Sequence, residues 1–147
     1  MMKPFILNKI IQNYKYTRMP QIKTQILYKE LSYTVVGIAF KVQNMLGRYA
    51  TEKQYGNLFE KKLQENNIIF EREKLISKTG DDINRADFVI DNSVIIELKA
   101  KPFIEKADYY QVKRYLEFTN FKLGIIINFR QKYLQPKRII NNKYSKQ

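Results

Sequence analysis

Apolar residues recur at helical spacing in two successive segments of the chain. The first stripe consists of Leu31, Val35, Ile38, Ala39, Val42, Met45 and Leu46. Apolar positions three and four apart share one helix face, so this stripe predicts a helix that Gly47 ends. A second helix is predicted from Thr51, a favourable N-cap, to Asn66. Its buried side carries Tyr55, Leu58, Phe59 and Leu63.

Strand patterns follow these two helices. Residues 68–73 alternate between apolar and polar, which predicts a strand, and residues 77–82 have the composition of turns. Two β-rich runs, 85–90 and 94–100, flank residues 91–93. This spacing predicts a hairpin with a three-residue loop.

The remaining elements complete an α/β pattern. Residues 105–119 predict a third helix. Residues 123–129 form a continuous apolar run, typical of a strand covered on both faces, and residues 137–140 can add an edge strand. The order helix, helix, strands, helix, strand predicts an α/β fold with a mixed central β-sheet flanked by helices.

The length of 147 residues suits one domain with a substantial core. We expect this domain over residues 29–141, after a basic, poorly ordered lead at 1–28 and before a polar tail at 142–147. No apolar run approaches the ~18 residues that span a membrane. Residues 1–11 lack the pattern of a signal peptide, so we expect a cytoplasmic protein.

The absence of cysteine and histidine narrows the possible chemistry. It excludes disulfides, thiolate zinc sites, imidazole ligands and every Ser-His or Cys-His pair. Any hydrolytic chemistry must therefore use carboxylates, lysine, tyrosine and a metal ion.

The formal net charge of +13 is unevenly placed, because the chain has no Asp or Glu before Glu30 or after Glu117. Basic ends around a neutral middle favour contacts with nucleic-acid phosphates. A composition rich in Lys, Ile, Asn and Tyr also arises from coding bias alone. Charge by itself therefore leaves both explanations open.

The predicted hairpin brings acidic and basic side chains together. If Ile90 pairs with Val94, Asp87 lies opposite Glu97, and opposed residues have Cβ atoms roughly 4.5–5.5 Å apart. Because strand side chains alternate, Glu97 and Lys99 lie on the same face. Two carboxylates this close repel each other unless a proton or a cation lies between them. A hard divalent cation such as Mg²⁺ is the obvious candidate.

Three helical residues are further candidates. Glu52 shares a helix face with Tyr55 and Phe59, where a carboxylate needs a partner or a metal, although the helix dipole also favours an acid in a first turn. Gln111 and Tyr115 lie four residues apart on the third predicted helix, which equally describes an ordinary surface pair.

Taken together, these residues resemble the motif of the PD-(D/E)xK nuclease superfamily. The spacing of Asp87, Glu97 and Lys99 has the form D-x9-E-x-K. More narrowly, the chain looks like the GxxExxY proteins, a branch of that superfamily. The similarity runs from about residue 30 to residue 129. It covers segments 30–33, 44–47, 52–55, 85–88, 95–100, 111–116 and 124–129.

The resemblance implies a restriction-endonuclease-like core and a nuclease that acts on DNA or RNA with Mg²⁺ or Mn²⁺. It also implies that Asp87, Glu97 and the Leu98 carbonyl hold the metal ion, that Glu52 completes the metal shell, and that Lys99 is catalytic. Gln111 and Tyr115 match the Q-x-x-x-Y helix of RecB-like members, which contacts substrate.

One position departs from the family motif. The glycine three residues before Glu52 is Tyr49 here, so the turn must be made differently, and Gly47 is the candidate.

Two other function classes remain open on sequence grounds. The chain could be a nucleic-acid-binding module on a nuclease fold, without turnover. It could instead be an assembly protein in which the carboxylates form an internal salt-bridge network. Metal-dependent cleavage distinguishes the nuclease from both. The sequence shows no interface pattern, so the oligomeric state is open.

Overall fold

The computed structural model describes residues 20–146, and their order is helix, helix, three strands, helix and two strands. The helices are α2 (Pro20–Leu46), α3 (Glu52–Glu65) and α4 (Lys106–Thr119). The strands are β1 (Phe70–Thr79), β2 (Asp82–Ile90), β3 (Val94–Lys99), β4 (Leu123–Asn128) and β5 (Lys137–Ile140). No helix in this part of the chain is long and apolar enough to cross a membrane.

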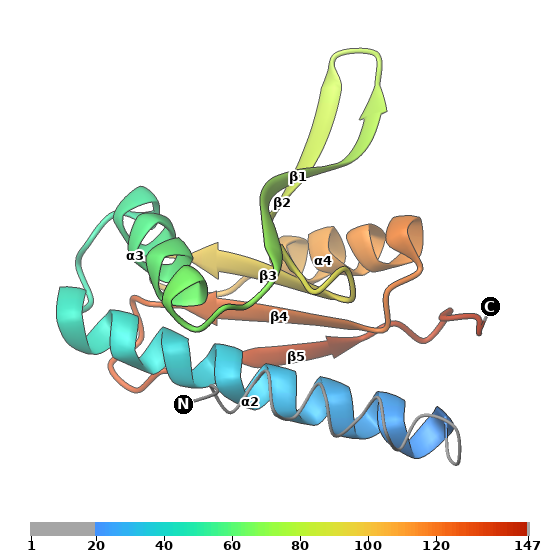
Figure 1. Ribbon diagram of the computed structural model, residues 1–147. Coiled ribbons are helices and arrows are strands. Elements are labelled where there is room, and N and C mark those ends of the chain that lie inside the picture. The colour runs from blue at the N-terminus through green and yellow to red at the C-terminus, as the bar shows by residue number, and fades with distance from the viewer. Residues whose placement is uncertain (1–19, 147) are drawn as a thin grey trace.

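The five strands form one mixed sheet in the order β1-β2-β3-β4-β5. Only β3 and β4 are parallel, and α4 connects them in the sequence. Helices α2 and α3 cover one face of the sheet and α4 covers the other (Figure 1). The fold is therefore the α/β sandwich that the sequence predicts. The two covered faces explain why every residue of β4 is buried.

Helix α2 begins earlier than the sequence analysis predicts. Residues 20–28, expected to belong to a poorly ordered lead, are helical, and the rest of that lead lies outside the described residues. Pro20 is the first helical residue, a position where its missing N–H costs no hydrogen bond. Once a helix is nucleated, each added residue costs little, so α2 extends beyond its buried stripe. It ends as predicted, with Gly47 at a φ of 75°.

Helix α3 confirms the predicted boundaries. Thr51 is its N-cap and Asn66 its C-cap, and the Thr51 side chain accepts a hydrogen bond from the Gln54 N–H. Gln54 in turn accepts one from the Thr51 N–H, which completes a capping box. This cap sets the direction in which α3, and with it Glu52, leaves the preceding loop.

The β1–β2 hairpin is longer than predicted, because the turn expected over residues 77–82 is confined to residues 80–81 and the strands take up the rest of that segment. Strand β1 continues to Thr79, which pairs with Asp82 at the start of β2. Gly80 makes the tight turn with a φ of 60°. The polar composition of this segment suits an exposed two-stranded ribbon as well as a loop, and the hairpin projects from the body of the molecule (Figure 1).

The hairpin between β2 and β3 has the predicted register. Ile90 pairs with Val94, Val89 with Ile95, and Phe88 with Ile96. Ile96 and Leu98 point into the core beneath α2 and α3. Glu97 is also buried, because α4 covers the opposite face.

Candidate active site

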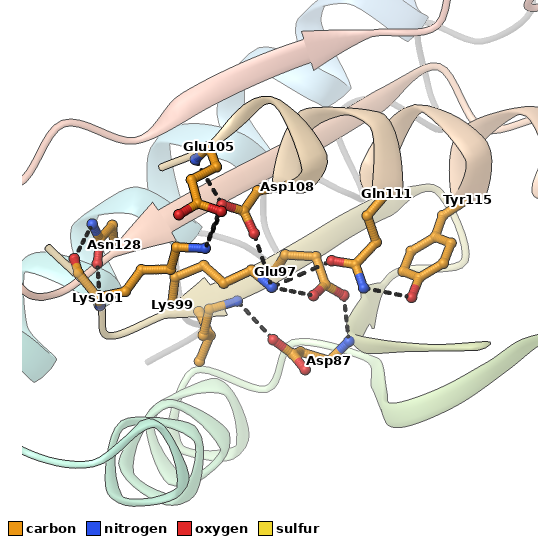
Figure 2. A network of polar contacts seen from close by, with 10 residues as sticks. Asp87, Glu97, Lys99, Lys101, Glu105, Asp108, Gln111, Tyr115 and Asn128 are labelled. Atoms are coloured by element: carbon orange, nitrogen blue, oxygen red, sulfur yellow. Dashed lines mark hydrogen bonds and ion pairs between the residues drawn. The ribbon is translucent and has the colours of Figure 1, made fainter. Parts of the chain in front are cut away.

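Asp87 and Glu97 lie where β2 and β3 separate. The paired ladder between the strands ends at Phe88 and Ile96. Beyond that point, the backbone N–H groups donate to side-chain carboxylates instead of to carbonyl groups of the neighbouring strand. The Asp87 N–H donates to Glu97 Oε1 at 2.8 Å, and the Leu98 N–H donates to Asp87 Oδ2 at 2.8 Å (Figure 2). Each carboxylate is thus oriented by one backbone amide, with its second oxygen left for other partners.

Burial changes the acidity of both carboxyl groups. Glu97 is only 3% exposed, and this burial, together with the charge of Asp87, raises its pKa to about 8. Burial also raises the pKa of Asp87, against the opposing effect of the Leu98 N–H. Two buried acids in contact resist a double negative charge, so the pair retains a proton near neutral pH unless a cation binds.

Lys99 completes the group at the end of β3. Its Nζ atom lies 4.0 Å from Glu97 Oε2, 3.6 Å from Asp108 Oδ1 and 3.3 Å from Gln111 Oε1 (Figure 2). The structure therefore brings together the acids and the lysine of the predicted motif. It also holds the ammonium between β3 and α4.

Gln111 and Tyr115 face the sheet, so they are not a surface pair. Gln111 Nε2 donates to the Tyr115 hydroxyl at 3.0 Å while Gln111 Oε1 accepts from Lys99. Tyr115 is 3% exposed, and burial followed by the nearby charge of Glu97 raises its pKa. The predicted residues of α4 are thus joined to the carboxylate pair through Lys99.

Asp108 is a residue that the sequence analysis missed. It is 7% exposed and contacts two lysines, Lys101 at 2.8 Å and Lys99 at 3.6 Å. Although burial opposes ionisation, the hydrogen bonds from Lys101 and the Glu105 N–H lower its pKa overall. Acidic residues are common in the first turn of a helix, so the residue type alone did not indicate a functional role for Asp108. The available signal was its place three residues before Gln111, on the same helix face.

Glu52 lies at a pocket beside the pair. It follows the cap of α3, and burial together with the charge of Asp87 raises its pKa. The pocket has a volume of about 410 Å³. Its lining residues are Glu52, Lys53, Gly56, Arg72, Glu73, Asp87, Phe88 and Leu98.

The side chain of Arg72, which comes from β1, lies against α3 at this pocket. Its Nη1 atom lies 2.6 Å from Glu60 Oε2, and a Cβ atom at Gly56 would come within 2.7 Å of Nη2. The absence of a side chain at Gly56 therefore provides the space in which this guanidinium lies.

The donor set fits a hard divalent cation held with few protein ligands. Within the described residues, no three acidic side chains come close enough to hold a metal ion among them. Asp87 and Glu97 nevertheless form a pair in which a bound cation would replace the shared proton and compensate both negative charges. Mg²⁺ commonly binds through one or two carboxylates, with water and substrate phosphates as further ligands. Whether Glu52 and the Leu98 carbonyl join them stays a prediction.

The chain matches the model of a known protein family. The family model of the PD-(D/E)XK nuclease superfamily matches residues 29–140, a range that contains every residue of the site described above. Searches of curated proteins and of solved structures find no match to this chain.

Proposed function

Because the chain belongs to the PD-(D/E)XK nuclease superfamily, we propose that it is a metal-dependent nuclease that hydrolyses phosphodiester bonds of DNA or RNA. The observation that carries the proposal is the buried Asp87–Glu97 pair with Lys99 beside it at the end of β3. Within the superfamily we assign the chain to the GxxExxY branch, on the strength of Glu52 and Tyr55 at the start of α3.

In this proposal Asp87, Glu97 and the Leu98 carbonyl hold Mg²⁺ or Mn²⁺, with Glu52 bound directly or through water. When bound, such an ion polarises the phosphate and lowers the pKa of a bound water. The two carboxylates are already oriented by backbone N–H groups, so little rearrangement is needed when the ion binds.

Lys99 orients the attacking water or offsets negative charge at the phosphorus. An ammonium group 4.0 Å from Glu97 Oε2 lies where it can stabilise negative charge that develops at the phosphorus. Gln111, which contacts Lys99 and Tyr115, is the side chain of α4 best placed to reach from this group to the substrate. Tyr115 supports Gln111 from a buried position.

The test is cleavage of labelled single- and double-stranded DNA and RNA with Mg²⁺ or Mn²⁺, beside an EDTA control. Glu97→Gln and Lys99→Met remove one charge each, and Glu117→Gln, at an exposed ion pair with Lys143, is the matched control. Cleavage that is lost with EDTA and in both site variants, but kept in the control, supports the nuclease. Full activity in Glu97→Gln contradicts it.

A nucleic-acid-binding module without turnover is the second candidate. It is favoured by the lack of a three-acid group among the described residues and by the net charge of +13. Such a module binds DNA or RNA equally well with EDTA and in Glu97→Gln. Salt-sensitive binding without cleavage on any substrate of the panel would favour it over the nuclease.

A further inference from the structure

An exposed tyrosine lies between two arginines at the loop that precedes α3. The Tyr49 side chain is 76% exposed. The guanidinium carbons of Arg48 and Arg130 each lie 5.4 Å from the centroid of its ring. We call these three residues the Tyr49 platform. An aromatic ring left in solvent and flanked by cations is an arrangement that favours binding of a planar, anionic partner.

The two arginines are held by backbone oxygens. Arg48 Nε donates to the Arg130 carbonyl at 2.9 Å, and Arg130 Nε donates to the Arg48 carbonyl at 3.0 Å. Arg130 Nη2 also donates to the Ala100 carbonyl at 3.3 Å. Within the described residues, neither guanidinium pairs with a carboxylate. Both positive charges therefore stay available to an incoming anion.

The platform is tied to the same edge of the sheet as the candidate site. Ala100, whose carbonyl binds Arg130, directly follows Lys99 at the end of β3. The loop between α2 and α3 lies beside the carboxyl ends of β3 and β4 (Figure 1). Tyr49 precedes Glu52 by three residues in that loop. The platform and the carboxylate pair therefore lie toward the same edge of the sheet.

The positive charge and the exposed ring of the Tyr49 platform indicate which kind of ligand it suits. The chain after Glu117 contains no acidic residue, so the surroundings of Arg130 in the sequence are basic. The bases of a duplex are already stacked on one another, whereas an unpaired base can lie on an exposed ring while arginines contact its phosphates.

We propose that the Tyr49 platform binds single-stranded DNA or RNA by stacking an unpaired base on Tyr49, and delivers that strand to the Asp87–Glu97 site. The delivery of the strand to this site rests on the proposed nuclease function. The binding itself does not depend on catalysis.

The chain contains no tryptophan, so Tyr49→Trp introduces a single fluorescent reporter into the full-length protein. Titrations in EDTA with oligothymidine, oligouridine and a duplex of equal length measure binding without cleavage. Tyr110→Trp is the matched control, because Tyr110 is also exposed, at 57%, with Lys113 Nζ 5.9 Å from its ring centroid. We expect single strands to quench the reporter at position 49 strongly and the control weakly. Equal quenching at both positions, or stronger quenching by the duplex, overturns the proposal.

Two substitutions test the contribution of the ring and of the charge. Tyr49→Ala should weaken single-strand binding about tenfold or more while Tyr49→Phe retains it, because stacking needs only the ring. Arg48→Gln should reduce the slope of log Kd against log salt by about one. Unchanged affinity in Tyr49→Ala overturns the platform.

The two proposals fail separately. Single-strand binding that persists in Glu97→Gln, with cleavage absent even in the parent protein, retains the platform and refutes the nuclease. Metal-dependent cleavage that is equally efficient in Tyr49→Ala, on single strands and duplex alike, retains the nuclease and refutes the platform. The oligothymidine and oligouridine titrations indicate which nucleic acid is preferred.

Discussion

The Asp87 N–H donates to Glu97 Oε1 at 2.8 Å, while the Asp87 carboxylate accepts from the Leu98 N–H one residue further along β3. Each carboxylate thus satisfies a backbone amide at the point where the two strands separate. The groups proposed to hold the metal ion also close the end of the β2–β3 ladder. Substitutions at these positions therefore act on both stability and chemistry.

Asp87→Ala should destabilise the fold by about 1–3 kcal/mol, because it leaves the Leu98 amide without its acceptor. Asp87→Asn keeps an acceptor oxygen and should cost less, although it also removes the negative charge. Urea unfolding in EDTA measures both variants. If Asp87→Ala is as stable as Asp87→Asn, this hydrogen bond contributes little to the fold.

The stability of the metal-free protein should fall as pH rises. The pKa of Glu97 is about 8 in the folded protein, against a reference value of 4.5. Between these values the folded state binds more protons than the unfolded chain, so the free energy of unfolding decreases with pH until the folded pKa is passed. From these two values we expect a loss of about 4 kcal/mol between about pH 5 and pH 9.

Urea unfolding in EDTA across that range measures this loss. Glu97→Gln cannot ionise and should give a flatter profile, with its largest gain over the parent protein at high pH. Parallel profiles for the two proteins would assign the pH dependence to other groups.

Mg²⁺ should raise the thermal midpoint of the parent protein, and more at pH 8 than at pH 6, because the cation must displace a proton from the Asp87–Glu97 pair. A hundredfold excess over Kd stabilises a folded protein by about 2.7 kcal/mol. Differential scanning fluorimetry with Mg²⁺ and with EDTA measures this shift. Glu97→Gln should lose most of it and Glu117→Gln none; an equal shift in all three proteins would place the cation elsewhere.

Asp108 should act by positioning Lys99. Asp108→Asn removes the charge that lies 3.6 Å from Lys99 and 2.8 Å from Lys101. We expect kcat to fall about 10- to 100-fold with little change in KM, because the ammonium is displaced but the substrate surface is not. Steady-state cleavage kinetics separate the two constants.

Glu105→Gln is the control for Asp108→Asn, since Glu105 is exposed and contacts Lys101 from the same end of α4. It should leave kcat near the parental value. A normal kcat in Asp108→Asn, or a raised KM alone, would argue against a positioning role.

Gly124 allows α4 to pack closely on β4. A Cβ atom at this position would lie 2.5 Å from Val112 Cγ1, a buried and stiff side chain. Gly124→Ala should therefore destabilise the fold by about 1–3 kcal/mol and displace the helix that carries Gln111. Gly37→Ala, with nothing within 4 Å of the added Cβ, is the control and should be neutral or stabilising.

Local patterns determined the elements and much of the site. The three-residue loop before Val94 dictated the register that places Asp87 beside Glu97, because side-chain alternation leaves no freedom once the loop length is set. The apolar run of β4 indicated burial on both faces, and Thr51 marked the start of α3. Local chemistry was ambiguous at 77–82, where polar residues form a paired ribbon, and at 20–28, where a helix extends beyond its apolar stripe.

Only the tertiary structure decided which distant side chains meet. The packing of α4 on the sheet brings Asp108 to Lys99, and the α2–α3 loop brings Tyr49 to Arg130, which follows β4. No periodicity encodes these contacts, because they depend on how separate elements pack across the sheet. Sequence spacing alone therefore identifies a motif within one hairpin, whereas the groups that surround it come from elements placed by the core.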